Sequence, residues 1–187
     1  MQQKWTNKLN NDEFNLIEND WYPLIKKNAM EKLKAQLHEL GQELQSLNPQ
    51  ESFKISAGDR LQDLPYLVLD FPKIPNPQFT FVCRTLFWWG RGVQFQLIYR
   101  GANTQLYSRI LSLAEPNDFI LLGSNLWEND ISMKAYKVLS ELNALEKAEV
   151  IEQDFFKLVR FKPIKNKESL FEGLLAFYLQ YANLAND

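Results

Sequence analysis

Polar and aromatic side chains alternate with apolar ones in the middle of the chain, which is the spacing of one face of a β-hairpin. Arg84 and Trp88 lie on this face of the first strand, and Gln94 and Gln96 lie on the same face of the second. A guanidinium, an indole and two amides resemble the few polar groups of an otherwise apolar ligand pocket. The alternative is structural: the C-terminal helix covers this face, while Arg84 and Arg100 extend along the sheet edge.

The tip of the same hairpin offers a second kind of site, because Trp88, Trp89 and Arg91 gather there and such residues dominate protein-binding hot spots. Neighbouring residues of a strand point to opposite faces. We expect Trp89 to join the core, so Trp88 needs another cover, either a helix of the same chain or a partner. The candidate ligand- or partner-binding residues are therefore Arg84, Trp88, Trp89, Arg91, Gln94 and Gln96.

The residue types of most catalytic sites are missing. His38 is the single histidine and is expected to face water, which argues against histidine acid–base catalysis and two-histidine metal sites. Cys83 is the single cysteine and is expected to be buried as a small apolar residue. Glycine-rich phosphate loops and nucleophile motifs do not occur. We therefore expect no cofactor and no metal, and a binding domain rather than an enzyme.

Carboxylates leave one chemical alternative, a small-molecule pocket with hydrolase or isomerase chemistry. Asp70 ends an apolar stretch, where burial would perturb its pKa. Glu128 and Asp130 flank Asn129 and have the oxygen ligands that a hard cation prefers. A structural role is the simpler interpretation of each of these residues.

The composition is that of a folded domain: 45% of the residues are hydrophobic and 13% are aromatic. Lys and Arg total 21 against 23 Asp and Glu, so general nucleic-acid binding is not expected. Acids crowd residues 115–154 and bases crowd 155–167, which fits either pairing within the chain or an anionic partner. No signal peptide and no apolar run of about eighteen residues is found, so we expect a cytoplasmic protein without membrane contact.

The first long element is a helix over residues 20–48, whose apolar residues are spaced three and four apart. This seam packs either on the domain's own sheet or on a second copy. It consists of Met30, Leu33, Leu37, Leu40, Leu44 and Leu47. Residues 1–18 are expected to form a short helix or arm around Phe14, Leu16 and Ile17.

Strands are expected at 52–56 and 65–71, joined by a turn at 57–60. The hairpin spans residues 79–100, and a three-residue loop, Gly90-Arg91-Gly92, would set Trp89 opposite Val93 and Phe87 opposite Phe95. This register makes one face almost entirely apolar and leaves the other mixed.

The remaining elements are a helix capped by Asn103 or Thr104, strands at 119–122 and 155–164, and a helix from about Lys167. Residues 131–153 are ambiguous, although their apolar spacing favours helix. The terminal helix is expected to bury an apolar stripe against the sheet, namely Leu170, Leu174, Phe177 and Tyr181.

Together these elements predict one α+β domain over residues 1–187, with a mainly antiparallel sheet, the central hairpin at 79–100 and long helices at both ends. The function that fits is an interaction domain that binds a protein partner or a second copy of itself. A small-molecule ligand in an Arg- and Trp-lined pocket is the alternative.

Overall fold

The computed structural model describes residues 9–72, 80–164 and 173–182. Its centre is a seven-stranded antiparallel sheet in the order β1-β2-β3-β4-β7-β5-β6. The strands are β1 (Lys54–Leu61), β2 (Leu64–Phe71), β3 (Thr80–Trp88), β4 (Gly92–Arg100), β5 (Phe119–Leu121), β6 (Tyr136–Val138) and β7 (Phe155–Lys162). The helices are α1 (Asn11–Glu18), α2 (Trp21–Leu47), α3 (Thr104–Leu113), α4 (Ala144–Glu152) and α5 (Leu174–Ala182), with a 3₁₀ turn, η1 (Leu139–Glu141), before α4. The predicted α+β class is confirmed.

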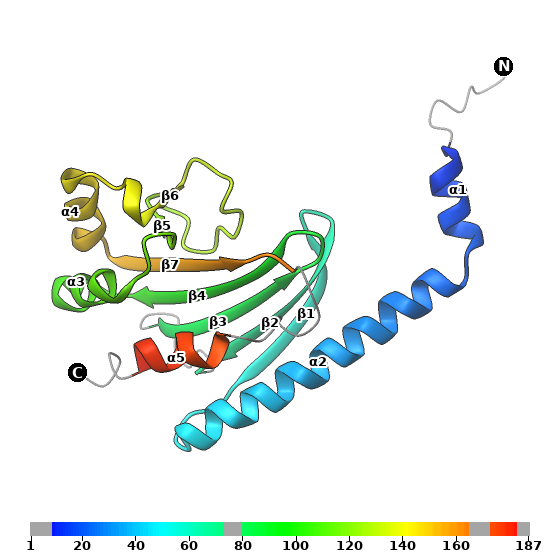
Figure 1. Cartoon of the computed structure of the whole chain (residues 1–187), viewed down its shortest axis with the longest axis horizontal. Helices are drawn as coiled ribbons and strands as arrows, with labels where there is room; N and C mark the ends of the chain where they lie inside the picture. The colour runs from blue at the N-terminus through cyan, green and yellow to red at the C-terminus, as the bar shows by residue number, and fades with distance from the viewer. Residues whose placement is uncertain (1–8, 73–79, 165–172, 183–187) are drawn as a thin grey trace.

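Helices and loops cover the two faces of the sheet differently. As Figure 1 shows, α2 and α5 lie along one face, α3 and α4 lie at one end, and the β5–β6 connection lies over the other face. Leu37 and Leu44 of α2 share the main core with Phe177 and Tyr181 of α5. The predicted burial of the terminal helix is thus confirmed for Leu174, Phe177 and Tyr181, while Leu170 lies outside the described residues.

The central hairpin forms, but its loop and register differ from the prediction. The three loop residues are 89–91, so Phe87 pairs with Val93 and Trp88 with Gly92. The left-handed conformation falls on Gly90, at φ +71°, and Gly92 also has a positive φ of +129°. Because the register shifts by two residues, every side chain keeps its predicted face. Only Trp89 changes role, since it lies in the loop instead of facing the core.

The α2 seam packs on the chain's own sheet over its C-terminal part, where Leu37, Leu40 and Leu44 are buried. Gly41 allows this close approach, because a Cβ there would lie 2.6 Å from the ring of Phe53. Leu47 was expected in the seam, and it is exposed. The seam therefore anchors only part of the helix to the sheet.

One local prediction was wrong, and one ambiguous stretch takes a form that its apolar spacing did not favour. The β1–β2 turn is at Gln62 and Asp63, both with positive φ, and not at 57–60, because Gly58 lies inside β1 with the ring of Tyr66 where a Cβ would be. Residues 131–153 are not one helix. Tyr136–Val138 pairs with β5, and α4 begins only at Ala144, where Asn143 as N-cap and Glu146 form a capping box. Tertiary pairing overrides the helical spacing here.

No helix in the described part of the chain combines the length and the apolar character that crossing a bilayer requires.

Candidate functional site

The mixed face of the hairpin is covered by residues 122–135, the connection between β5 and β6, and the expected cover by the C-terminal helix does not occur. Leu126 of this covering loop packs on Val82 and Ile98 of the sheet. The terminal helix lies on the opposite face. The candidate residues of the mixed face therefore lie inside the molecule.

Arg84 forms a buried ion pair below the covering loop. Its guanidinium donates to both carboxylate oxygens of Asp70, at 2.6 and 3.0 Å. The ring of Trp127, from the covering loop, lies 5.0 Å from the guanidinium carbon. Asp70 is buried, as its position at the end of an apolar strand suggested, and Arg84 pairs with this carboxylate instead of extending along the sheet edge.

Lys157 is the least expected member of this polar layer, since its side chain is fully buried on β7. Its amine donates to the backbone carbonyls of Leu126, at 3.2 Å, and Glu128, and to the side-chain oxygen of Asn129 at 3.3 Å. Burial is the main reason that its pKa falls to about 7, and the nearby charge of Arg84 lowers it further. The amine thus holds the covering loop through oxygen atoms, without an ion pair among the described carboxylates.

The two glutamines join the same layer. Gln94 donates to the carbonyl of Asn129 at 2.9 Å, and Gln96 donates to the side-chain oxygens of Gln94 and Asn129 at 2.8 and 3.0 Å. The amide oxygen of Gln96 itself, Oε1, is buried without a hydrogen-bond partner among the residues that the structure describes. Arg84, Gln94 and Gln96 are brought together as the sequence predicted, but they bind the protein's own loop.

The carboxylates of the covering loop shape its backbone. Glu128 accepts hydrogen bonds from the N–H groups of Asn129 and Asp130. The carboxylate of Asp130 accepts hydrogen bonds from Ser132 and Gln62. These hydrogen bonds lower the pKa of Asp130, and the bond from the Ser132 side chain has the largest effect. In the ranges that the structure describes, no cluster of metal-ligating side chains is found.

Neither single-copy reactive residue belongs to this layer. Cys83 is buried, and burial raises the pKa of its thiol to about 12, so it is a thiol at neutral pH. His38 is exposed on α2, and the centroid of its ring lies 5.3 Å from that of Phe53 in an edge-to-face arrangement. Arg160 pairs with Asp118 at 2.8 Å and Glu115 at 2.9 Å, so pairing within the chain accounts for this one base of the basic stretch.

The hairpin tip reverses the expected roles of its tryptophans. Trp88 is buried against Val68 and Leu86, and its indole N–H donates to the carbonyl of Leu61 at 3.0 Å. Arg91 lies over the Trp88 ring, 5.6 Å from its centroid. Trp89 is half-buried. The chain itself therefore supplies the cover that Trp88 needed.

An apolar pocket of about 290 Å³ opens between this tip and α2. Helix α2 contributes Ala29, Met30 and Leu33, and the two hairpins contribute residues that include Pro65 and Trp89. This pocket lies where α2 leaves the sheet. The pocket therefore lies between the sheet and the first turns of α2, next to the part of the helix that extends beyond the sheet.

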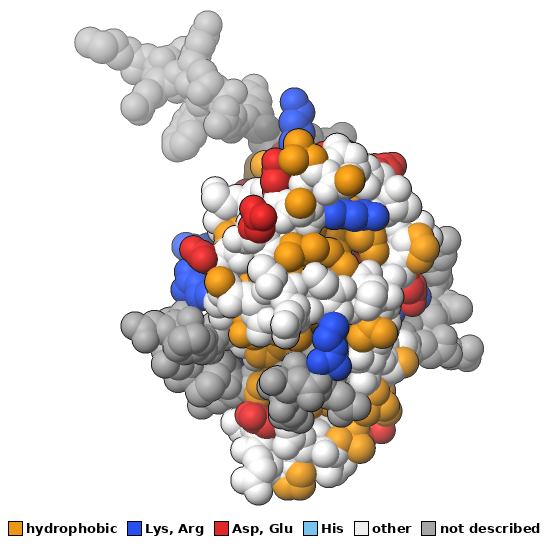
Figure 2. Space-filling model, turned by 90° about the vertical axis from the view of Figure 1, so that its left-hand side faces the viewer, with side chains coloured by type: hydrophobic (Ala, Val, Ile, Leu, Met, Phe, Trp, Pro, Cys, Tyr) orange, Lys and Arg blue, Asp and Glu red, His pale blue; other side chains and the backbone are white. Residues whose placement is uncertain are grey.

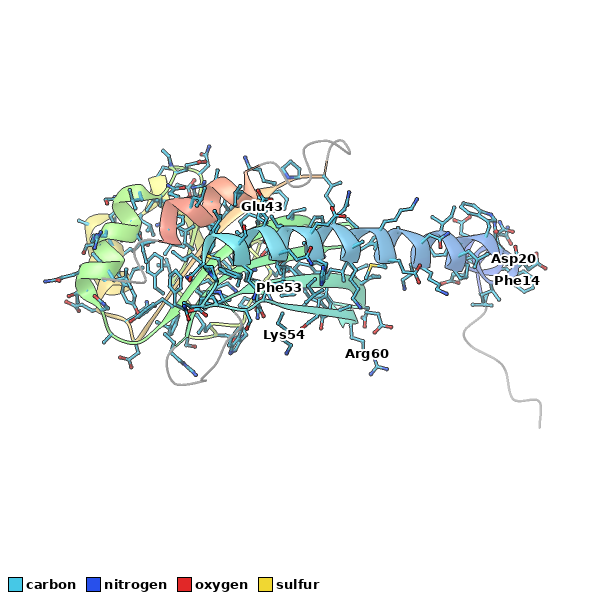
Figure 3. The ribbon with its side chains drawn as sticks, turned by 90° about the horizontal axis from the view of Figure 1, so that it is seen from below. Phe14, Asp20, Glu43, Phe53, Lys54 and Arg60 are labelled. Carbon is cyan, nitrogen blue, oxygen red and sulfur yellow. The ribbon has the colours of Figure 1, made fainter. Side chains whose placement is uncertain are left out.

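Residues 11–25, named the arm here, extend from the sheet with almost no cover from the rest of the chain. Figure 3 shows α2 crossing the sheet and continuing past it, with Phe14 and Asp20 at the free end. Every arm residue except Asn19 is exposed. Its exposed large apolar side chains are Phe14, Leu16, Ile17, Trp21, Tyr22, Leu24 and Ile25.

The other end of the molecule provides a contrast. Figure 2 views the end that carries α3 and α4, where apolar side chains form small groups separated by polar and backbone atoms. Scattered apolar residues of this kind are normal on protein surfaces, whereas a contiguous exposed group marks an interaction site.

Sequence reasoning missed Lys157, Asn129 and most of the arm. A signal existed for Lys157, because it lies between Phe155 and Val159 on one face of an apolar strand. Residues 1–18 were predicted as a short helix or arm and residues 20–48 as a long helix, but the exposure of residues 11–25 depends on where the sheet ends beneath α2. No protein-family model, curated protein or solved structure matches this chain.

Proposed function

We propose that this chain is a protein-interaction domain that binds its partner through the arm. The observation that carries the proposal is the run of exposed apolar and aromatic side chains from Phe14 to Ile25. Trp, Tyr and Phe are enriched at the cores of protein interfaces. The sheet and its covering helices then act as the scaffold that holds the arm out.

The stability of α1 supports the same conclusion. It has eight residues and no buried side chain, and its capping box of Asn10 and Glu13 is its main local support. Isolated helices shorter than about 12–15 residues are marginal in water. A partner that covers Phe14 and Ile17 would supply the burial energy that α1 lacks within the chain.

The charge of the arm favours a protein over a lipid surface. Residues 9–25 contain Asp12, Glu13, Glu18 and Asp20 and no Lys or Arg. Amphipathic helices that bind anionic membranes carry Lys and Arg on their polar face. An acidic arm is repelled by such a surface and needs an apolar partner with basic groups around it.

Photocrosslinking in the cells from which the chain comes tests this proposal. The photoreactive residue benzoylphenylalanine replaces Trp21 in the full chain, and replaces Met133 in a control, because both side chains are about half exposed, at 53% and 51%. We expect protein adducts at position 21 and not at position 133. Absence of adducts at position 21, or equal adducts at both positions, would overturn the proposal.

A small apolar ligand in the tip pocket is the second candidate, since about 290 Å³ is close to the lower end of ligand-site volumes of about 300–1,000 Å³. Arg84 does not line this pocket, so such a ligand would be bound by apolar contact. Ala29→Phe would fill the space. Saturable binding of a fluorescent fatty acid to the wild type, lost in this variant, would support the second candidate; equal binding to both would contradict it.

A further inference from the structure

We infer that the arm binds a second copy of this chain, with the two α2 helices antiparallel and a two-fold axis near Lys26. This inference rests on the proposed function, because it names the partner of the same arm. Its starting observation is the order of charges along the chain, from α1 into the first turns of α2. The acidic arm is followed at once by a basic stretch, residues 26–34, which carries Lys26, Lys27, Lys32 and Lys34 against the single acid Glu31.

The antiparallel arrangement pairs these charges. With the axis near Lys26, Asp20, which directly precedes α2, lies beside Lys32 of the other copy, and Glu18, the last residue of α1, lies at the end that carries Lys34. All four side chains belong to exposed residues, so they are available for contact. A parallel pair would set acid beside acid and base beside base, which costs energy. Charge order therefore selects a second copy in the antiparallel direction.

The same axis brings the apolar groups together. Trp21 and Tyr22 of the second copy lie beside the turn of α2 that contains Met30, which lines the tip pocket. The pocket offers open apolar space, and the arm offers aromatic side chains without cover. Each copy carries both an arm and a pocket, so a two-fold axis satisfies both at once and closes the assembly.

With the axis near Lys26, residues 18–34 of one copy run along the same residues of the other copy in the opposite direction. The buried centre would consist of Trp21, Leu24 and Ile25, with the acid–base pairs at its rim. Opposite charges at this rim fix direction and register, and like charges there would strongly oppose association.

Light scattering on the full-length chain tests the inference through a charge exchange. The arm variant carries Glu18→Lys and Asp20→Lys, and the body variant carries Lys32→Asp and Lys34→Asp. We expect the wild type to have about twice the chain mass of 22.0 kDa and each variant alone to be monomeric. An equimolar mixture of the two variants should recover the doubled mass, because each arm then meets an opposite charge on the other chain.

A matched control has the same number of charge reversals elsewhere, Glu149→Lys and Glu152→Lys on the exposed side of α4, and should remain a dimer. Circular dichroism of each variant serves to check that it is folded. A monomeric wild type, or a mixture that stays monomeric, would overturn the inference. Adducts at position 21 with a different protein would then still support the proposed function, whereas absence of adducts would reject both.

Discussion

The amine of Lys157 lies beneath the covering loop and donates a hydrogen bond to the backbone carbonyl of Leu126, 3.2 Å away. Lysine is almost never fully buried unless it is paired. Here backbone and amide oxygens replace the carboxylate partner. The contact joins the central sheet to the loop that closes its mixed face, so the charge state of one side chain is linked to the stability of the fold.

The first prediction concerns pH. The amine of the unfolded chain keeps its proton up to an ordinary pKa of 10.5, whereas the folded chain releases it near a pKa of 7. Stability therefore rises with pH between these values, because the unfolded state binds more protons. Urea unfolding at pH 7 and pH 8.5 should show a gain of about 1–2 kcal/mol.

The upper measurement at pH 8.5 lies below the pKa of an ordinary thiol. At higher pH the unfolded chain would lose the Cys83 proton that the folded chain keeps, so stability would fall and oppose the rise caused by Lys157. Lys157→Met provides the control and should show no gain over the same interval. A wild type whose unfolding free energy is the same at both pH values would contradict the burial of a titrating amine.

A second prediction tests the ion pair of Arg84 and Asp70. Arg84→Met leaves a buried carboxylate without its partner and should lower the unfolding free energy by about 3–5 kcal/mol. The double variant Arg84→Met with Asp70→Leu removes both charges and should recover most of that loss. Chemical denaturation of the two single variants and the double variant measures the coupling; strictly additive losses would show that the pair does not act as a unit.

The tryptophans at the hairpin tip give a third prediction. Trp88→Ala should cost about 3–5 kcal/mol, because it leaves a cavity and removes the hydrogen bond to Leu61. Trp89→Ala removes a half-buried ring, and its cost should be clearly smaller. Thermal and urea unfolding compare them, and a larger loss for Trp89→Ala would mean that the indoles have exchanged roles.

Gly90, in the hairpin loop, and Gly92, at the start of β4, differ in a way that mutation can measure. A Cβ at Gly90 would meet nothing within 4 Å, whereas one at Gly92 would lie 2.5 Å from the ring of Phe161. Gly90→Asn should be nearly neutral, because Asn tolerates the left-handed conformation. Gly92→Ala should cost about 2 kcal/mol or more, from strain and crowding together. Equal costs in urea unfolding would argue against the loop at 89–91.

Much of the fold could be predicted from the sequence, because alternation of apolar residues determines which face each side chain joins. The hairpin shows the limit. Loops starting at Trp89 or at Gly90 differ by two residues in register, and both keep Phe87 and Phe95 on the core face. Burial alone could not choose between them.

The sequence could not predict which segment covers the mixed face of the sheet, or that almost nothing in the described chain covers the arm, because both depend on contacts between distant segments. The apolar residues that the covering loop packs against the sheet, which include Leu126, Ile131 and Ala135, are irregularly spaced, so its sequence has no periodic signal. The exposed first turns of α2 continue the helical pattern of its buried part, and only the edge of the sheet determines that Leu37 is buried while Ile25 is exposed. Arg84, Gln94 and Gln96 lie on the face that the alternation predicted, whereas Trp89 does not face the core, and the accessibility of all the candidate residues required the tertiary structure.

The most direct test of the arm as a binding surface is hydroxyl-radical footprinting of the protein in its own cells. Trp21 is 53% exposed and Trp127 is 44% exposed in the single chain, so an uncovered arm would be oxidised at Trp21 at least as strongly as at Trp127. We predict that Trp21 is oxidised several-fold less than Trp127, because a partner covers it. Oxidation of Trp21 equal to or above that of Trp127 would contradict the proposed function.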